Sequence, residues 1–445
     1  MITNLFGTDG IRKTVGQSPF TVHELPLLGW AIGNWLRTKY KTDIEILIAH
    51  DTRQSAAFIK AALNTGLLAH PITVHDAHIL PTPAVSHLVQ NHASLVCGIV
   101  VSASHNPYCD NGLKIFDDTG NKISQADSDH ISALFNQAKH NFKPTYDFFG
   151  AEHQANSLAQ EYISAVCALF APNFLSGTTV TLDCAHGATY QVAPRIFEQL
   201  GAQVHQVCTT YNGTNINDQC GSEHPENLQR IVQENGSDIG FAFDGDGDRV
   251  IAINKMGAIK NGDHIVAALL DHPRYADQPA IVGTDMTNQG LAVYVQHKNK
   301  KLLRTPVGDV QVMRRLVTDN LLLGGEQSGH IIMRDISNNA DGIITALRIM
   351  ESIRHSGNWL MDSFKAFPQT LINVPISMKK NLNEPPLSTL IEQYTTQLDK
   401  SSRLLVRYSG TESIIRVMVE DANEIHAQNV GTELSLALKK ELHIS

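Results

Sequence analysis

The chain has 445 residues, of which 42% are hydrophobic and 18% charged, so it can build a folded core and is neither disordered nor fibrous. At roughly 100–200 residues per domain, this length predicts about three or four domains. The formal net charge of −9 excludes a basic surface for nucleic acid across the whole fold. The sequence shows no signal peptide and no stretch of roughly 20 apolar residues for a membrane span. Six scattered cysteines without a CxxC spacing indicate reduced thiols. We therefore expect a cytoplasmic protein that binds neither membranes nor nucleic acid.

One pattern recurs along the chain: a short apolar run ends abruptly in Gly, Asp, Ser or Asn. Such runs predict buried strands; they begin at Ile44, Leu95, Val180, Ile239, Ile281 and Leu321. Helix-like segments lie between them, at Ser55–Ala69, Ala188–Leu200 and Pro225–Asn235. This alternation predicts an α/β fold with mixed, largely parallel sheets. Ligands of such sheets gather beyond the carboxyl ends of the strands, where the polar clusters fall.

Breaks in this pattern divide the chain into four predicted domains. The polar segment Asn141–Glu152 separates a first unit from a second, and Lys255–Gly262 opens a third. Four prolines within Pro368–Pro386 indicate a linker before a smaller C-terminal domain. We therefore expect α/β domains at 1–150, 151–255 and 256–367, followed by an α+β domain at 368–445.

The first polar loop whose side chains could take part in a reaction is Ser102-Ala-Ser-His-Asn-Pro107. Proline stops the preceding strand, so Ser104 lies on a turn. A serine hydroxyl is a poor nucleophile without a base or a metal. Taken alone, the motif favours a turn in which Ser104 and Asn106 cap neighbouring backbone groups.

The second loop, Asp244-Gly-Asp-Gly-Asp-Arg249, lies between two apolar runs. Three carboxylates at alternate positions would repel one another unless a cation held them, and the glycines allow the backbone to curl around it. An EF-hand is excluded because its sixth and twelfth positions would be Arg249 and Lys255. Oxygen ligands favour Mg²⁺. We therefore favour a magnesium site over a solvated acidic turn.

Two further loops offer groups for a sugar and a phosphate. Gly324-Gly-Glu-Gln-Ser-Gly-His330 could hydrogen-bond to sugar hydroxyls, although a polar hairpin is nearly as good an interpretation. Arg407-Tyr-Ser-Gly-Thr-Glu-Ser-Ile-Ile-Arg416 combines two guanidinium groups, hydroxyls and a glycine, which suits phosphate binding. In the alternative interpretation, Thr411 and Glu412 simply begin a helix.

Taken together and in this order, the four loops resemble the α-D-phosphohexomutase superfamily across nearly the whole chain. The opening Phe6–Arg12, Gly221–Pro225, Val307–Asp309 and Arg416–Glu420 look like the branch that acts on glucosamine phosphate. The resemblance implies three related α/β domains and a smaller C-terminal α+β domain around one central cleft. It also implies an isomerase that interconverts glucosamine 6-phosphate and glucosamine 1-phosphate, in the synthesis of UDP-N-acetylglucosamine and cell-wall precursors.

The resemblance also assigns roles to residues. Ser104 would carry the phosphoryl group, and Asp244, Asp246 and Asp248 would bind one Mg²⁺ per chain together with the Ser104 phosphate. Lys114 and His330 are the two candidates for the general acid/base, and Arg12 and His105 would lie near the transferring group. The implied sugar-phosphate contacts are Glu326, Ser328, Arg249, Arg407, Ser409, Gly410, Thr411 and Arg416.

The implied intermediate is glucosamine 1,6-bisphosphate, with glucose 1,6-bisphosphate as a possible primer, and a homodimer is possible. A phosphomannomutase or phosphoglucomutase with the same chemistry is the nearest alternative. A sugar-phosphate sensor without catalysis is less favoured, because Ser104 and all three aspartates are present.

Overall fold

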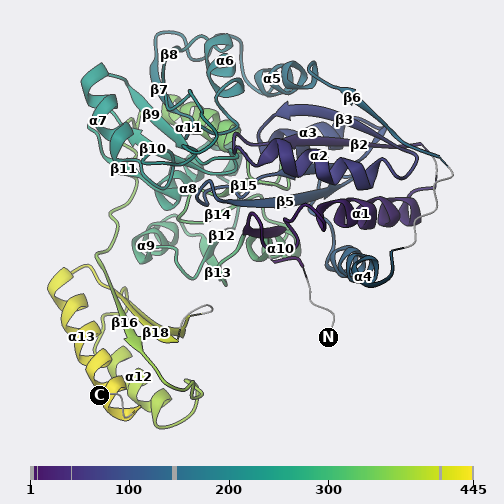
Figure 1. Cartoon of the computed structure of the whole chain (residues 1–445). Coiled ribbons are helices and arrows are strands. Elements are labelled where there is room, and N and C mark those ends of the chain that lie inside the picture. The colour runs from purple at the N-terminus through teal and green to yellow at the C-terminus, as the bar shows by residue number, and fades with distance from the viewer. Residues whose placement is uncertain (1–4, 8, 42, 143–147, 410–412, 443–445) are drawn as a thin grey trace.

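The computed structural model describes residues 5–7, 9–41, 43–142, 148–409 and 413–442. Within them the chain forms four sheets in chain order, each with its own helices (Figure 1). No helix in these ranges is long and apolar enough to cross a membrane. The predicted α/β class with mixed, largely parallel sheets is confirmed.

The first sheet has the strand order β1-β5-β4-β2-β3-β6. Strands β2, β3, β4 and β6 run parallel, whereas β5 is antiparallel to both β4 and β1. The elements are β1 (Ile11–Thr14), α1 (Leu25–Lys39), β2 (Ile44–His50), α2 (Ala56–Leu67), β3 (Ile72–Ile79), α3 (Thr82–Asn91), β4 (Leu95–Val101), β5 (Asp110–Asp117), α4 (Gln125–Asn141) and β6 (Ala151–Gln154).

Helices cover both faces of this sheet, which explains why its central strands β2 and β4 bury apolar side chains on both faces. Successive side chains of a strand point to opposite faces. In β2, Ile46 and Ile48 belong to the core formed with α1, α2 and α4, whereas Leu47 and Ala49 belong to the core that includes α3. The short strand β6 extends the sheet beyond Gly150, and all four of its residues are exposed.

The second and third sheets continue this plan with the orders β11-β10-β9-β7-β8 and β13-β12-β14-β15. The second unit contains α5 (Leu158–Ala168), β7 (Thr179–Asp183), α6 (Val192–Gln199), β8 (Gln203–Val207), α7 (Glu226–Asn235), β9 (Ile239–Phe243), β10 (Val250–Asn254) and β11 (Ile259–Lys260). The third contains α8 (Gly262–Leu270), β12 (Ala280–Thr284), α9 (Gln289–His297), β13 (Lys301–Thr305), α10 (Asp309–Thr318), β14 (Leu323–Gly325), β15 (Ile331–Met333) and α11 (Gly342–Ser356), with a 3₁₀ turn at Pro273–Tyr275.

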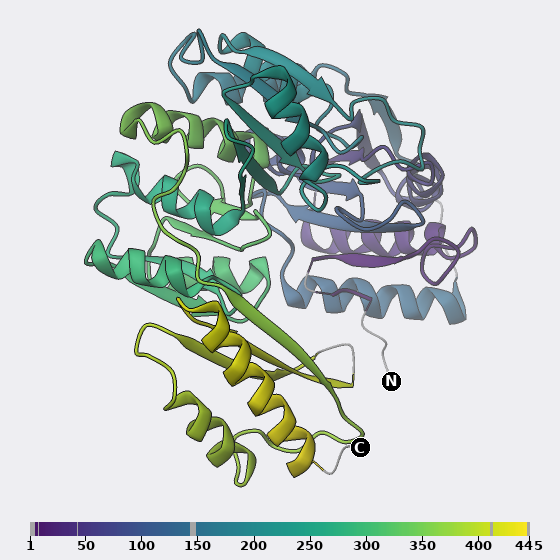
Figure 2. The same cartoon turned by 90° about the vertical axis from the view of Figure 1, so that its left-hand side faces the viewer.

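The fourth unit is an antiparallel sheet, β16-β18-β17, covered by helices. Its elements are β16 (Gln369–Pro375), α12 (Leu387–Thr395), β17 (Arg403–Tyr408), β18 (Ile414–Glu420) and α13 (Glu424–Glu441). It lies below the rest in Figure 1 and in the turned view of Figure 2.

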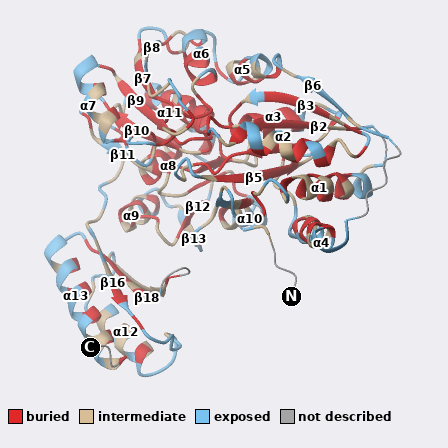
Figure 3. Ribbon diagram, viewed as in Figure 1, coloured by how far each residue is buried: buried red, intermediate tan, exposed pale blue. Residues whose placement is uncertain are grey.

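The cores separate the fourth unit from the first three. One buried cluster runs from Phe116 in the first unit through Tyr162 and Phe243 in the second to Ile343 in the third. The Tyr162 hydroxyl also donates to Asp341, the N-cap of α11, at 2.7 Å. The fourth unit instead packs its own cluster around Val374. Figure 3 shows the buried residues concentrated where the first three units meet. These three therefore form one body to which the fourth is joined.

Candidate active site

The serine loop follows β4 and turns back into β5. Ser104 has a left-handed backbone (φ 56°), and its Oγ donates to Asp244 of the second unit at 2.5 Å. The hydroxyl of Ser102 instead donates to Asp51 at 2.6 Å and is fully buried. Of these two serines, Ser104 therefore faces the acidic loop, because the hydroxyl of Ser102 is bound to Asp51. A left-handed backbone at a non-glycine residue costs free energy and is typical of functional sites.

A buried arginine that the sequence analysis missed holds this loop in place. Nε of Arg53 binds Asp51 at 2.8 Å, and Nη2 donates to the carbonyl oxygens of Ser104 and Asn106 at 2.9 and 2.7 Å. Nδ2 of Asn217, from the second unit, donates to the same Ser104 oxygen at 2.9 Å. Arg53 could have been picked out from the sequence because it lies in the polar cluster after β2. Nothing in the sequence around Asn217 marks it as a residue that supports the loop.

The acidic loop joins β9 to β10 and is buried. Single oxygens of Asp244, Asp246 and Asp248 lie within 4.8 Å of one another. Gly245 is required here because a Cβ would lie 2.6 Å from the Ser104 carbonyl oxygen. One oxygen each of Asp246 and Asp248 is buried without a hydrogen-bond partner among the described residues. Buried carboxylates with orphan oxygens are the donors that Mg²⁺ prefers, so these residues fit such an ion.

The charges in this loop are unevenly distributed. Burial, together with the charges of Asp248 and Asp246, raises the pKa of Asp244 well above its usual value. Burial alone would also raise the pKa of Asp248, but the ammonium of Lys114 outweighs it, and the pKa is well below the usual range. Lys114 therefore favours the ionised form of Asp248, whereas burial and its acidic neighbours favour the neutral form of Asp244.

Lys114 provides the buried cation of the site. Its Nζ lies 2.7 Å from Asp248, 2.8 Å from Asp246 and 3.4 Å from Asp9. Burial opposes the charge, but these carboxylates outweigh it and raise the pKa of Lys114 well above normal. The ammonium group is thus retained at neutral pH.

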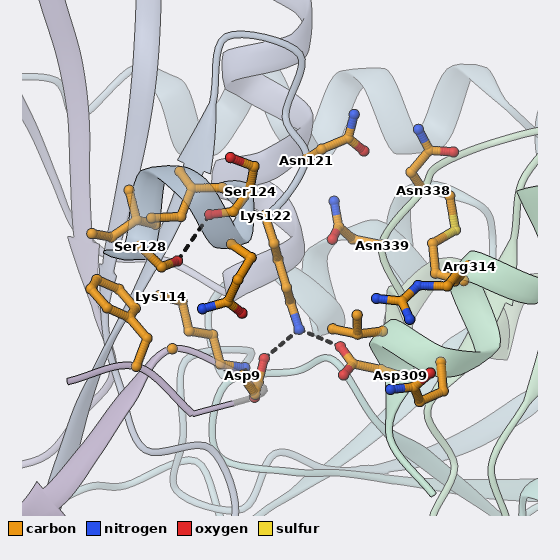
Figure 4. A pocket seen from close by; sticks show the side chains of 18 of the residues that line it. Asp9, Lys114, Asn121, Lys122, Ser124, Ser128, Asp309, Arg314, Asn338 and Asn339 are labelled. Atoms are coloured by element: carbon orange, nitrogen blue, oxygen red, sulfur yellow. Dashed lines mark hydrogen bonds and ion pairs between the residues drawn. The ribbon is translucent and has the colours of Figure 1, made fainter. Parts of the chain in front are cut away.

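A second lysine connects the first and third units across the cleft. Nζ of Lys122 donates to both Asp9 and Asp309, the latter in the first turn of α10 (Figure 4). Burial opposes its charge, yet the two carboxylates raise the pKa of Lys122. Lys122 was not expected from the sequence, because both its partners are distant along the chain, and Asp9 lies in the Phe6–Arg12 motif without having been assigned a role.

His330 lies between the acidic loop and α10. Nδ1 is 3.6 Å from Asp248 and Nε2 is 3.7 Å from Asp309. Burial would lower the pKa of the imidazole, but the two carboxylates outweigh it and raise the pKa. His330 and Lys114, the two residues predicted as candidates for the general acid/base, thus both lie beside Asp248.

The remaining residues predicted near the transferring group surround Ser104. Nδ1 of His105 is 3.2 Å from Ser104 Oγ, and burial, with the nearby Arg249 and Arg12, lowers the pKa of His105 to about 4. Arg12 pairs with Asp9 and also donates to Asn106 at 3.4 Å. Nη1 of Arg249 binds Glu223 at 2.9 Å. His105 is therefore neutral at pH 7 between two cations.

A cleft of about 520 Å³ lies over these groups and reaches the predicted sugar loop. It is lined by Ser104, Arg12, Arg249, His330 and Glu326. The Glu326 carboxylate accepts from the backbone N–H of Gly308 at 3.0 Å, which ties the sugar loop to the turn before α10. Ser328 is half-buried in the same loop.

The predicted phosphate loop belongs to the fourth unit, and its described residues, 407–409 and 413–416, do not line this cleft. Arg407 of β17 and Arg416 of β18 are directly opposite each other in the antiparallel pair. Ser409 is buried and its N–H donates to the Ile414 carbonyl oxygen at 3.0 Å. Gly410 and Thr411 lie outside the described residues. The structure thus brings Arg407 and Arg416 together, but not with Ser104.

Family models match the chain from end to end. Domain I of the phosphoglucomutase/phosphomannomutase family matches residues 3–142, domain II 160–257, domain III 261–371 and the C-terminal domain 371–435. The structure is similar to that of a family protein from Burkholderia thailandensis, with a TM-score of 0.80, 23% identity and coverage of 99% of this chain and 98% of that one. A phosphoglucomutase from Paramecium, described as an open form, gives a TM-score of 0.76 at 18% identity and covers 99% and 96%.

Sequence relatives are similar over the same extent. The phosphoglucosamine mutase of Deinococcus radiodurans is 41% identical over 427 residues, which is 95% of each chain. That of Thermus thermophilus is 40% identical over 438 residues, 97% of this chain and 96% of the relative. The resemblance stated from the four loops is confirmed. The chain therefore belongs to the phosphoglucomutase/phosphomannomutase family, on the branch of the phosphoglucosamine mutases.

Proposed function

We propose that the chain is an isomerase that interconverts glucosamine 6-phosphate and glucosamine 1-phosphate, with Ser104 as the phosphoryl carrier. The carrying observation is the position of the Ser104 hydroxyl, 2.5 Å from Asp244 in a loop of three buried carboxylates. A serine that only capped an exposed turn would not be held against three buried carboxylates. Full-length relatives that bear this activity in their names support the choice of sugar.

The reaction consists of two transfers. The phosphoryl group of phosphorylated Ser104 passes to O1 of glucosamine 6-phosphate, whose hydroxyl proton leaves, and the serine oxygen regains a proton. The 1,6-bisphosphate then presents its other end, and the 6-phosphoryl group returns to Ser104. Such a transfer depends on positioning and on neutralised oxygens more than on covalent chemistry by the protein.

Each requirement has candidate residues in the cleft. Asp244, Asp246 and Asp248 would hold Mg²⁺, which neutralises charge on the phosphoryl oxygens. Lys114 adds a fixed positive charge beside them. Arg53 and Asn217 fix the serine backbone from behind, so the hydroxyl keeps one position in both transfers.

Proton movement falls to Lys114 or His330, the two titratable cations beside Asp248. His105, neutral and 3.2 Å from Ser104 Oγ, can hydrogen-bond to the serine oxygen in its unphosphorylated state. The pH–rate profiles of Lys114→Arg and His330→Gln distinguish the two candidates, because only loss of the proton carrier removes one limb of the profile.

The distal phosphate belongs, in this proposal, to Arg407, Ser409, Gly410, Thr411 and Arg416. Arg407 and Arg416 lie directly opposite each other on antiparallel strands, so both guanidinium groups would be able to donate to one phosphate. Neither Arg407 nor Arg416 lines the cleft, so we infer that the fourth unit moves toward the cleft when substrate binds.

Turnover on glucosamine, glucose and mannose 6-phosphates tests this proposal, with glucose 1,6-bisphosphate as primer. We expect the highest kcat/KM for glucosamine 6-phosphate, and an intact mass that falls by one phosphate after phosphatase treatment. Equal kcat/KM for all three sugars would favour a general phosphohexomutase. A phosphorylated protein without turnover on any of them would contradict the proposal. The four domain boundaries, the homodimer and the cytoplasmic location remain predictions.

A further inference from the structure

A second group of possible metal ligands lies in the second unit, at the carboxyl ends of β7 and β8. His186 follows β7, Cys208 follows β8, and Cys220 lies on the segment that leads toward α7. One nitrogen of His186 and the sulfurs of Cys208 and Cys220 all lie within 4.8 Å of one another. None of the three belongs to the catalytic machinery described above.

The donors form a different kind of site from the acidic loop. Thiolate and imidazole ligands suit Zn²⁺ and related borderline or soft ions, whereas Mg²⁺ takes oxygen ligands. With Zn–S at about 2.3 Å and Zn–N at about 2.0–2.1 Å, tetrahedral ligand atoms are separated by about 3.5–3.8 Å. The three donor atoms, all within 4.8 Å of one another, are therefore close enough for small side-chain adjustments to bring them around one ion.

Three further features suit an ion at this position. Nδ1 of His186 is buried without a hydrogen-bond partner among the residues that the structure describes. The Asp183 carboxylate, fully buried, is held by the N–H groups of Ala185 and Gly221 at 2.9 Å each and interacts with Cys208. Cys208 and His186 are only partly buried, so an ion has access from solvent.

The backbone supports this arrangement at a cost. His186 and Cys208 have left-handed backbones, with φ of 49° and 52°, and the His186 N–H donates to the Cys208 carbonyl oxygen at 2.6 Å. Such conformations at residues other than glycine persist where the surroundings impose them and are frequent at ligand sites. Two of the three proposed ligands, His186 and Cys208, thus have a strained backbone.

We propose that His186, Cys208 and Cys220 form a site for one Zn²⁺ ion, with a water molecule as the fourth ligand. On binding, the two thiols lose their protons to solvent and the imidazole donates through Nδ1. The Asp183 carboxylate lies next to Cys208 and contributes negative charge without being one of the three ligands.

The site would be linked to the serine loop through backbone contacts. The His186 carbonyl oxygen accepts from Thr52 Oγ1 of the first unit at 2.5 Å. Asn217, three residues before Cys220, donates to the Ser104 carbonyl oxygen, and its own N–H donates to Ala185. An ion here would therefore brace the segment that supports Ser104 from the second unit.

Co²⁺ is the probe, because its thiolate complexes absorb in the near ultraviolet. The full chain is reduced, desalted without oxygen and titrated with Co²⁺ in excess Mg²⁺, which occupies the acidic loop. We expect a sulfur-to-cobalt band that saturates at one Co²⁺ per chain and disappears when Zn²⁺ is added. Absence of the band would overturn the proposal. A thiol count lower by two, because Cys208 and Cys220 form a disulfide, would also overturn it.

Variants assign the band to these residues. Cys208→Ser and Cys220→Ser should lose it, and His186→Asn should weaken Co²⁺ affinity at least about 10-fold, since even an outer-shell change costs about 10–100-fold. The half-buried Cys167→Ser and the acidic-loop Asp246→Asn are the controls and should retain the band. Circular dichroism checks folding; if a cysteine variant is unfolded, His186→Asn decides. Wild-type affinity in folded His186→Asn contradicts the proposal.

Discussion

Removing the buried ammonium of Lys114 should destabilise the metal-free protein and at the same time strengthen its affinity for Mg²⁺. Lys114→Met retains the aliphatic stem but leaves Asp9, Asp246 and Asp248 without their shared cation. Loss of one partner from a buried charge network costs about 3–5 kcal/mol. At an unfolding entropy of about 2.1 cal/mol/K per residue, the body of roughly 370 residues formed by the first three units shifts by about 1.3 °C per kcal/mol, so Tm in EDTA should fall by about 4–7 °C.

Mg²⁺ and Lys114 act on the same carboxylates, so the ammonium repels an incoming Mg²⁺. The variant should therefore show a larger rise in Tm on addition of Mg²⁺ than the wild type, although its turnover should fall by orders of magnitude. Thermal unfolding in EDTA and in a Mg²⁺ series measures both effects. Lys60→Met, which removes the partner of Asp76 away from the acidic loop, is the control and should leave the Mg²⁺ shift unchanged. An equal or smaller Mg²⁺ shift in Lys114→Met would refute the reasoning.

Three other substitutions test separate parts of the molecule. Ser104→Ala should abolish turnover and covalent phosphate, and phosphopeptide mapping that placed phosphate on Ser102 would contradict the assignment. Arg416→Ala should raise KM for glucosamine 6-phosphate by roughly 10- to 150-fold, because charge-assisted bonds contribute about 1.5–3 kcal/mol; an unchanged KM would remove the C-terminal loop from the substrate site. Burial raises the pKa of Glu420 from 4.5 to about 7, although Arg403 opposes this shift. Between these two pKa values the folded state holds a proton that the unfolded state has released, so stability falls as pH rises from about 4.5 to about 7. Glu420→Gln removes this loss of about 3 kcal/mol, so its Tm advantage should grow between pH 5 and pH 8, whereas a constant difference would show that Glu420 ionises normally.

Local sequence was sufficient where the chemistry is contiguous. The three aspartates lie within five residues, and their alternation with glycine predicted a curled acidic loop that the structure contains. Residues that act through distant partners were missed. Arg53 lies 51 residues from the carbonyl group it holds, and Lys122 lies 187 residues from Asp309. No periodicity marks such pairs, because only the assembled sheets bring them together.

Helix ends and edge strands were similarly hard to predict. The segment Ala188–Leu200 was expected to be helical throughout, but α6 begins at Val192 because the Ala188 N–H donates to the Gly245 carbonyl oxygen in a turn. Strand β6 lies in the segment expected as a polar linker; all its residues are exposed, so it has no apolar alternation to reveal it. The hydrophobic pattern within the fourth unit predicts its own fold. It does not predict where the unit lies against the others, because that depends on polar contacts such as Asn288 with Glu420.

The close approach of Gly245 to the Ser104 carbonyl oxygen limits how this enzyme can be recombined. The two loops come from different units, and even a Cβ at position 245 would come within 2.6 Å of the Ser104 carbonyl oxygen. A chimera that joined the first unit to the second unit of a distant homologue would have to reproduce that contact to a fraction of an ångström. The fourth unit has its own core and meets the others through polar contacts such as that of Asn288 with Glu420. Exchanging the C-terminal unit alone should therefore change the affinity for the distal phosphate and leave the sugar loop of the third unit in place, whereas the phosphoryl carrier and its acidic loop must be inherited as one block.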